Sequence, residues 1–419
     1  MKISIIADIH LNNSLYKTIH DRDDPKLPFR VADFLRSFEH MVDENINVIK
    51  PDLIVLAGDI YESYDPPNTI RAFFYTQCMK ISEAGISLAI IVGNHDICKE
   101  HHALLPLMAM SNDNIKIYDE PYFVEFKNKN LMFFPYSLSV ENGSISLRQQ
   151  FYDFIESCEA KRNKDKETLF FGHFGVKGAT LKTIEKKENK KIKIKSKSDD
   201  NIHIEDLENI NADYIFLGDY HEHQILPVKN AIAMYTGSIE KSDMSECNQK
   251  KGYVVFDDNL KKDSKMGETT FKEYPKCRPM LELKGNVEEI LSQIESVDES
   301  LYQNAIVKIS FVGVRQEFIN FSIHLSDIKS KIQKKFNAIH IYGGHKCIDN
   351  VIKDNSESNE DGKDEQNEKI IDKGYIDEEL VLEVVQEMIS EKESDKAEQE
   401  IIIKMAKEIY KETKESTTQ

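Results

Sequence analysis

Side chains suited to binding metal ions follow five short apolar segments of this 419-residue chain. Asp, Asn and His residues end these segments, and glycine precedes the polar residues in four of them: Asp8-Ile9-His10, Gly58-Asp59, Gly93-Asn94-His95-Asp96, Gly172-His173 and Gly218-Asp219-Tyr220-His221. Carboxylate and amide oxygens combined with imidazole nitrogens suit manganese, iron or zinc. The set offers more than six ligands, which is too many for one such ion and enough for two. Two adjacent ions can hold both the attacking and the leaving oxygen of a phosphoryl displacement.

The order of apolar runs predicts an α/β fold that brings these residues together. In the first third of the chain, strand-like runs alternate with stretches of helical spacing. The runs cover 2–7, 52–57 and 86–92, and the helical stretches cover 29–48 and 69–84. This alternation predicts a mostly parallel sheet with helices on its faces. Ligands bind at the carboxyl ends of the strands in such sheets, so the five segments should face one crevice.

The chain becomes richer in strands after residue 115, and we expect a first domain over residues 1–274. Strand-like runs cover 115–118, 122–126, 131–135, 168–171, 213–217, 231–235 and 252–257, with one helix over about 146–159. A change in composition near residue 274 marks the boundary. Two of the runs end directly before Gly172-His173 and Gly218-Asp219, which places these residues at the same predicted sheet edge.

Three further parts follow the first domain. Residues 275–349 alternate strand and helix signals and predict a small α+β domain. Residues 350–372 are polar, acidic and almost free of aromatic side chains, which is typical of a disordered linker. Residues 373–419 predict two short amphipathic helices, whose apolar faces need another surface to cover them. That surface is either a partner protein or the core of this chain.

Composition excludes several classes of protein. With 40% apolar residues the chain can bury a core, and no apolar run approaches the ~20 residues that span a bilayer. An aspartate at position 8 is not typical of a signal peptide, and the six cysteines are scattered as reduced thiols would be. We therefore expect an intracellular, cytoplasmic protein that is not bound to a membrane. The net charge of −18 argues against coating nucleic acid by bulk charge, but an enzyme can hold phosphate through metal ions.

The ordered set of motifs resembles the calcineurin-like metallophosphoesterase superfamily, whose motifs run DxH, GD, GNH(D/E), GH and GHxH. The resemblance covers about residues 1–240. The sequence YTGSIE at 235–240, followed by Asp243, Glu246 and Lys251-Gly252-Tyr253, is similar to a segment of the SbcD-type DNA-repair nucleases and their phage relatives. Arg278-Pro279 stands where the cap domain of that family begins. The resemblance implies a sandwich of two mixed sheets flanked by helices, then a small cap domain over 275–349 and a helical tail.

The resemblance also implies a role for each motif residue. His95 is the expected catalytic residue, which reaches the scissile phosphate and the leaving oxygen. Asp59 is expected to bridge two divalent ions, with manganese as the first choice and magnesium, iron or zinc as alternatives. The implied ligands of the first ion are Asp8, His10, Asp59 and His221, and those of the second are Asp59, Asn94, His173 and Asp219.

Two positions differ from the pattern of the family. The fifth motif is GHxHxxQ, and Gly218 and Gln224 fix a frame in which Asp219 replaces its first histidine. A carboxylate in place of an imidazole shifts the metal preference of a site toward harder ions. In the alternative frame, His221 and His223 form the HxH pair. Glu62 stands where the nucleases commonly have a histidine that helps to position the DNA end, and the ring of Tyr61 beside it could stack on bases. We expect Glu62, Tyr61 and His223 to contact substrate.

The sequence therefore predicts a metal-dependent DNA exo/endonuclease, the nuclease subunit of an SbcC/SbcD-type recombination and repair complex. Its expected partners are DNA, an SMC-like coiled-coil ATPase of the SbcC type, and a second copy in a homodimer. One alternative is a small-molecule or protein metallophosphoesterase, which leaves the 235–253 segment, the cap domain and the tail unexplained. Another is a structural subunit that bridges DNA ends, with chemistry weakened by Asp219 and Glu62.

Overall fold

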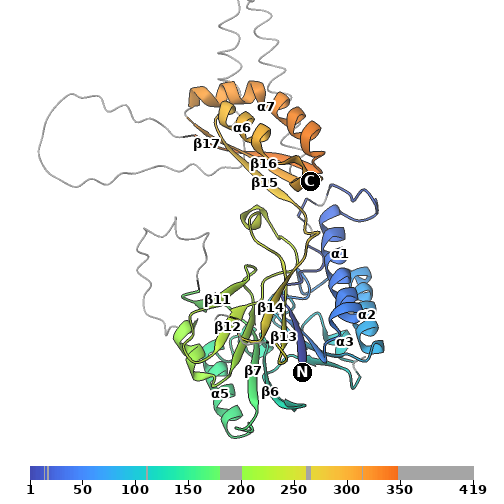
Figure 1. The fold of residues 1–419 in the computed structure, drawn as a ribbon, viewed down its shortest axis with the longest axis vertical. Helices are drawn as coiled ribbons and strands as arrows, with labels where there is room; N and C mark the ends of the chain where they lie inside the picture. Colours follow the sequence, from blue (N-terminus) through green and yellow to red (C-terminus); the bar gives the residue numbers. More distant parts are fainter. Residues whose placement is uncertain are drawn as a thin grey trace, which may run out of the picture. The chain divides into compact units, whose positions relative to one another are not determined.

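The computed structural model describes residues 1–347, except 14, 17, 110–111, 180–200, 261–265 and 314. The chain divides into two compact units, of which the first spans Met1–Arg278 and the second begins at Pro279 (Figure 1). The linker expected over 350–372 and the helices expected over 373–419 lie outside the described residues.

The first sheet of the Met1–Arg278 unit has six strands in the order β14-β13-β1-β2-β3-β4. Strands β1 to β4 run parallel, and β13 and β14 extend the sheet as an antiparallel pair. Helices α1 (Phe29–Glu44) and α2 (Asn68–Glu83) connect β1 to β2 and β2 to β3, so the predicted βαβαβ order is present. The strands are β1 (Lys2–Ile6), β2 (Leu53–Ala57), β3 (Ser87–Ile91), β4 (Ile115–Tyr118), β13 (Gly252–Asp257) and β14 (Thr269–Glu273).

The second sheet has six strands in the order β11-β12-β10-β7-β6-β5. Its four central strands run parallel, and the edge strands β5 and β11 are antiparallel to their neighbours. The strands are β5 (Tyr122–Phe126), β6 (Lys129–Phe134), β7 (Glu167–His173), β10 (Tyr214–Gly218), β11 (Gln224–Leu226) and β12 (Ile232–Tyr235). The remaining elements of the unit are short, apart from α5: α3 (Leu105–Met108), α4 (Leu138–Glu141), α5 (Leu147–Glu159), β8 (Val176–Lys177), β9 (Ile202–His203) and the single turns Asn45–Ile49, Ile204–Asn209 and Met244–Glu246.

The two sheets pack face to face, because alternate residues of their strands share one apolar core. Ile5 and Val55 of the first sheet lie in this core with Phe171 and Phe216 of the second. The outer face of the first sheet is covered by α1 and α2, and that of the second by α5. The predicted two-sheet α/β sandwich flanked by helices is confirmed.

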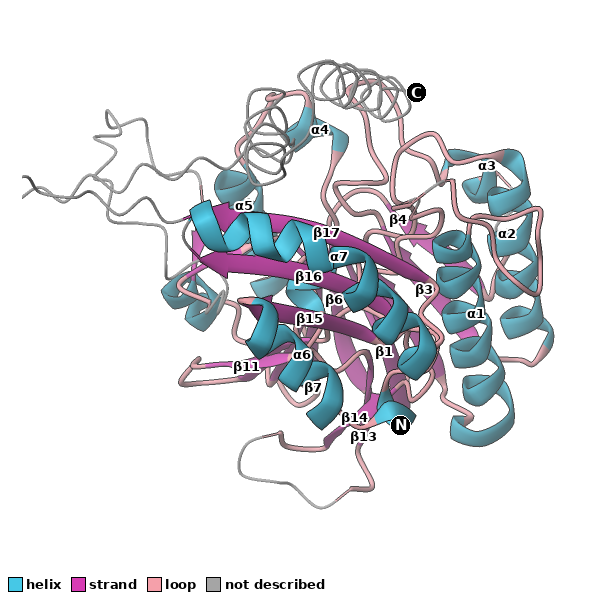
Figure 2. Ribbon diagram, turned by 90° about the horizontal axis from the view of Figure 1, so that it is seen from above, coloured by secondary structure: helices cyan, strands magenta, loops and turns pink. Residues whose placement is uncertain are grey.

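The unit that begins at Pro279 is a three-stranded parallel sheet with helices on one face (Figure 2). Its elements are β15 (Met280–Gly285), α6 (Val287–Ser296), the turn Glu299–Leu301, β16 (Ile306–Gly313), α7 (Arg315–Phe336) and β17 (His340–Cys347). Asn286 caps α6 by accepting a hydrogen bond from the backbone N–H of Glu289. Leu283, Ile309 and Ile328 belong to a separate core.

Across the described residues, no helix combines the length and apolar content that crossing a bilayer requires. Five cysteines in this part of the chain form no disulfide bond.

A buried charge network holds Arg278, the last residue of the first unit, in place. The guanidinium of Arg30 is fully buried and donates to Asp33 Oδ2 at 2.7 Å. Arg278 Nε donates to the same oxygen at 3.0 Å, and the backbone N–H of Arg278 donates to both carboxylate oxygens of Glu240 at 3.2 Å. Ser37 Oγ donates to Glu240 Oε2 at 3.2 Å. The YTGSIE segment and the Arg278-Pro279 pair, which are distant in the sequence, therefore meet in one buried cluster.

We predict that Glu240→Ala lowers the free energy of unfolding by about 3–5 kcal/mol, because it removes one partner from a buried charge network. Urea unfolding at neutral pH measures this change. The matched control is Glu273→Ala, which removes an exposed 2.7 Å ion pair with Lys250 and should cost at most about 1 kcal/mol. Equal unfolding midpoints for the two variants would show that the buried cluster is not a source of stability.

Candidate metal centre

The polar residues that end β1, β2, β3, β7 and β10 meet where the two sheets come together. Backbone hydrogen bonds join the loops after β1 and β2: the N–H groups of Ile9 and His10 both donate to the carbonyl of Asp59, at 2.9 and 3.0 Å. The N–H of Asp219, after β10, donates to Asp8 Oδ1 at 2.9 Å, which links the second sheet to the first. The predicted convergence of the five segments on one place is therefore seen in the structure.

The chain turns sharply after three of these strands, β1, β2 and β10. Asp8, His10 and Asp59 have φ angles of 51°, 46° and 49°, and Asp219 has a φ of 100°. Residues other than glycine rarely adopt this left-handed region, and such backbone conformations gather at functional sites. The turns place the carboxylates and the imidazole at the end of the strand instead of on a face of the sheet.

Two glycines make room for neighbouring side chains of the centre. A Cβ atom on Gly58 would lie 2.0 Å from Nδ1 of His173, and one on Gly93 would lie 2.1 Å from the backbone nitrogen of Asp59. Gly58 also has a φ of 88°, which favours glycine. The glycine before each of these polar residues therefore leaves space for a candidate ligand from another strand, His173 beside Gly58 and Asp59 beside Gly93.

One half of the centre consists of Asp8, His10 and His221, whose possible ligand atoms lie within 4.8 Å of one another. Nε2 of His10 lies 3.0 Å from Nε2 of His221. Two imidazole nitrogens at this distance need a proton or a cation between them. Asp8 Oδ2 is buried and has no hydrogen-bond partner among the described residues. An unpartnered carboxylate oxygen beside two facing imidazoles fits a divalent cation.

The other half consists of Asp8, Asp59 and His173. His173 Nδ1 lies 2.8 Å from the carbonyl oxygen of Ala57, which can only accept, so Nδ1 carries the hydrogen and Nε2 is left as the ligand atom. This Nε2 lies 3.2 Å from Asp59 Oδ1 and 3.0 Å from Asn94 Oδ1. Asp59 Oδ2 points to the first half, 3.7 Å from His10 Nε2. The two oxygens of Asp59 thus face the two halves, which is the geometry of a bridging ligand.

The centre carries more negative charge than its histidines neutralise. Burial alone would lower the pKa of His173, but the adjacent Asp59 carboxylate outweighs burial and raises this pKa to about 10. Burial would raise the pKa of Asp59, yet the charge of His173 brings it well below its usual range. Burial, and then the carboxylates of Asp8 and Asp59, raise the pKa of Asp219. A proton on His173 neutralises this crowding in part, and bound cations would do so more completely.

His95 lies at the exposed side of the centre, as expected of a residue that meets substrate. Its backbone N–H donates to Asp59 Oδ1 at 2.9 Å, and its ring makes an edge contact with His10, with 4.9 Å between ring centroids. Its Nδ1 lies 3.0 Å from the carbonyl oxygen of Glu62. Nε2 is therefore the nitrogen left for a substrate.

Tyr61 and His223, which the sequence predicts to contact substrate, lie outside the centre. Tyr61 is buried in the core and packs edge-on against Phe74, with 5.5 Å between centroids. His223 stacks on Phe271 at 4.4 Å, and its Nδ1 lies 2.9 Å from the carbonyl oxygen of Tyr235. The structure thus puts His221, and not His223, opposite His10, which favours the frame in which Asp219 and His221 form the fifth motif.

Sequence reasoning assigned no role to Glu246. Its carboxylate contacts the nitrogen of His221 that points away from the centre. Glu246 Oε1 lies 2.7 Å from His221 Nδ1, and Glu246 Oε2 lies 2.7 Å from Lys251 Nζ. Burial would raise the pKa of Glu246, but its bonds to His221 and Lys251 lower it to about 2. A carboxylate on the outer nitrogen fixes which nitrogen of a histidine faces a metal ion. The only sequence signal was the presence of Glu246 and Lys251 in the nuclease-like segment.

Asp96 joins the loops that follow β2 and β3. Its carboxylate accepts hydrogen bonds from the backbone N–H groups of Gly93, Ile60 and Tyr61, at 3.0, 3.1 and 2.9 Å. Complete burial, together with the charge of Asp59, raises the pKa of Asp96 to about 6. Asp96 therefore holds the two loops together and does not itself face the centre.

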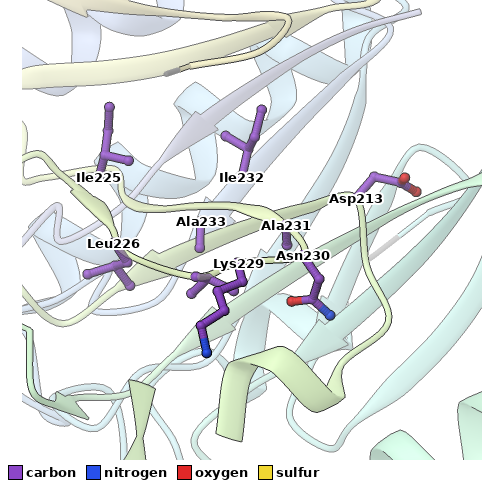
Figure 3. A pocket seen from close by; sticks show the side chains of 9 residues that line it. Asp213, Ile225, Leu226, Lys229, Asn230, Ala231, Ile232 and Ala233 are labelled. Atoms are coloured by element: carbon purple, nitrogen blue, oxygen red, sulfur yellow. The ribbon is translucent and has the colours of Figure 1, made fainter. Parts of the chain in front are cut away.

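A hollow of about 540 Å³ lies elsewhere on the second sheet (Figure 3). It is lined by residues such as Asp213 and Ile232, which stand at the amino ends of β10 and β12. The centre lies after the carboxyl end of β10, so this hollow and the centre are at opposite ends of that strand.

Comparison with known proteins identifies the family. The family model described as calcineurin-like phosphoesterase matches residues 1–224, which is more than half of the chain. The chain therefore belongs to the calcineurin-like phosphoesterase family, and it is a metal-dependent hydrolase of phosphoester bonds. The resemblance that the five motifs indicated is confirmed.

Two curated relatives and one solved structure illustrate the similarity. The SbcD subunit of the nuclease SbcCD from Staphylococcus epidermidis is 24% identical over 405 residues, which cover 90% of this chain and 92% of that protein. The DNA double-strand break repair protein Mre11 of Methanococcus maripaludis is 26% identical over 259 residues, 60% of each chain. A dimetal phosphatase from Danio rerio has 12% identity and a TM-score of 0.39, over 61% of this chain and 91% of that one.

We predict that divalent-ion binding by the half that contains Asp8, Asp59 and His173 releases about one proton near neutral pH, because His173 must lose its proton before Nε2 can bind a cation. The pKa of His173 in the ion-free protein is raised to about 10, so the competing proton is present at pH 7 and is lost only as the pH rises toward that value. Affinity for manganese should therefore increase with pH, by up to about tenfold per unit. Calorimetric titrations in buffers of different ionisation enthalpy measure the released proton. An enthalpy that is the same in every buffer would contradict this prediction.

Proposed function

We propose, from the membership of this chain in the calcineurin-like phosphoesterase family, that it is a two-metal DNA exo/endonuclease and the nuclease subunit of an SbcC/SbcD-type complex. The observation that carries the proposal is the arrangement of Asp59, whose two oxygens face two separate groups of ligands at 3.2 and 3.7 Å from His173 and His10. A pair of adjacent ions can stabilise both the attacking and the leaving oxygen of an in-line displacement at phosphorus.

In this proposal each half of the centre holds one ion. Two divalent ions, with manganese as the first choice, would stabilise the charge that develops on the phosphate. The buried carboxylates hold the ions in place, and His95 at the exposed side would give a proton to the leaving oxygen through Nε2. The first ion would be held by Asp8, His10, Asp59 and His221, and the second by Asp59, Asn94, His173 and Asp219.

The choice of DNA as substrate is supported by what lies beyond residue 224. The similarity to the SbcD subunit of the nuclease SbcCD extends over 405 residues, well past the part that the family model matches. A phosphoesterase for small molecules would need the centre alone, whereas the Glu240–Arg278 contact holds the segment that leads out of the first unit. We propose that 275–349 is a cap domain, that 350–372 is a linker, and that 373–419 binds an SMC-like ATPase, with the protein acting as a homodimer.

The proposal predicts that the purified chain cleaves DNA in the presence of manganese. His95→Ala should reduce the rate by about 10²–10⁴-fold, the usual contribution of a general acid, and should leave manganese binding intact. His20→Ala, at an exposed histidine in the loop before α1, is the matched control and should keep the wild-type rate.

Single-stranded DNA, double-stranded DNA and a nitrophenyl phosphate are compared as substrates in the same experiment. Hydrolysis of the nitrophenyl ester alone would reject the DNA assignment. Binding of manganese and DNA without any cleavage would instead favour a structural subunit that bridges DNA ends.

Asp219 gives a second test, on the identity of the ions. Asp219→His restores the imidazole that the family carries at this position, so we predict a shift from manganese and magnesium toward zinc. Competition titrations should show a change of about tenfold in the ratio of manganese to zinc affinity, the size expected for a change at a metal ligand. An unchanged ratio would mean that Asp219 does not bind an ion.

A further inference from the structure

We propose that Glu62 is a positioning residue of the metal centre, which orients His10 through its side chain and His95 through its main chain. The family resemblance instead led us to expect Glu62 at the substrate, in place of a histidine that positions the DNA end. The inference rests on the proposed function, because it assigns Glu62 a task within the same site.

The carboxylate of Glu62 contacts the outer nitrogen of His10. Glu62 Oε2 lies 3.2 Å from His10 Nδ1 and accepts a hydrogen bond from Asn13 Nδ2 at 3.3 Å. His10 Nδ1 makes no aligned hydrogen bond among the described residues, but the negative charge of the Glu62 carboxylate 3.2 Å away favours the hydrogen on Nδ1, which leaves Nε2 with its lone pair. That Nε2 faces His221 at 3.0 Å, inside the first half of the centre. Carboxylates placed in this way on ligand histidines orient the ring and raise its basicity toward the ion.

The main chain of Glu62 contacts the catalytic candidate. Its carbonyl oxygen lies 3.0 Å from His95 Nδ1, so Nδ1 of His95 also carries a hydrogen and Nε2 is directed to the substrate side. This carbonyl is held in place, because the N–H of Glu62 donates to the carbonyl of Leu11 at 3.0 Å. The preceding N–H, that of Tyr61, donates to Asp96. One residue therefore touches both a ligand histidine and the histidine that would meet the leaving group.

The environment of Glu62 favours this task over contact with DNA. Its side chain is 36% exposed, and Oε2 faces both His10 and the buried amide of Asn13. A carboxylate directed at a DNA backbone would repel the phosphates, whereas one directed at an imidazole is stabilised by it. Glu62 therefore lies at the edge of the centre, where its carboxylate contacts the candidate ligand His10.

Manganese titration of two variants tests the carboxylate. Glu62→Ala removes the acceptor, and we expect affinity for one of the two ions to fall by about 10–100-fold. Glu62→Gln keeps an oxygen that can accept from Nδ1 of His10, so its affinity should stay within a few-fold of wild type. Asp65→Asn, three residues along the same loop at an 81% exposed carboxylate, is the matched control. Calorimetry and electron paramagnetic resonance count the ions, and ion-free thermal unfolding checks the fold of each variant.

Nitrogen NMR of the ion-free protein tests the main-chain contact. Neutral His95 should carry its hydrogen on Nδ1, and a hydrogen predominantly on Nε2 would overturn this half of the inference. The carboxylate half would be overturned if Glu62→Ala bound both ions like wild type and lost affinity for DNA in calcium, because Glu62 would then be a substrate contact.

These outcomes are separable from those that test the proposed function. If the wild-type protein binds two ions and cleaves no DNA, the nuclease assignment fails while weaker manganese binding by Glu62→Ala still supports the inference. If the wild-type protein cleaves DNA and Glu62→Ala binds manganese unchanged, the inference fails and the nuclease assignment stands.

Discussion

Two buried carboxylates, those of Asp8 and Asp59, and the half-buried carboxylate of Asp219 lie close together, and the rest of the first unit is organised around this concentration of charge. Asp8 is fully buried and one of its oxygens has no hydrogen-bond partner among the described residues. Like charges in a medium of low polarity repel strongly, so such a group persists only if cations or protons neutralise it. In the ion-free protein the pKa of His173 is raised, so His173 keeps a proton that neutralises part of this charge. Divalent ions would neutralise the same carboxylates and would also supply the chemistry of the centre.

The sandwich of two sheets is what makes this concentration possible. Asp8 and Asp59 follow neighbouring parallel strands of the first sheet, while His173 and Asp219 end neighbouring parallel strands of the second. The apolar core between the sheets holds these strand ends in register, and the left-handed turns after the strands gather the side chains between them. The free energy that opposes the crowding is therefore supplied by apolar burial far from the charges.

The sequence was sufficient to predict that the motifs lie at strand ends, because each motif follows an apolar run. The order of these runs determines the sheet. The edge strands β11 and β14 were not predicted, since Gln224–Leu226 is short and Thr269–Glu273 mixes polar and apolar residues. Periodicity also cannot reveal that Glu246 reaches His221, because the contact depends on how the loop after β12 folds. For Tyr61, in contrast, the sequence suggested a contact with substrate that its burial does not support. An aromatic residue beside a predicted site looks available for stacking, but its ring completes the core under α2.

The histidines of the two halves differ in what holds their outer nitrogens. His10 and His221 each face a glutamate, Glu62 and Glu246, whereas His173 faces the backbone carbonyl of Ala57. A carboxylate makes an imidazole a stronger donor to a cation than a carbonyl does, so the first half gains basicity through its histidines. The second half gains it directly, because Asp219 stands where the family has an imidazole. The two halves therefore become stronger donors in different ways, and the Asp219 carboxylate is the change that favours hard cations that bind oxygen over softer ones.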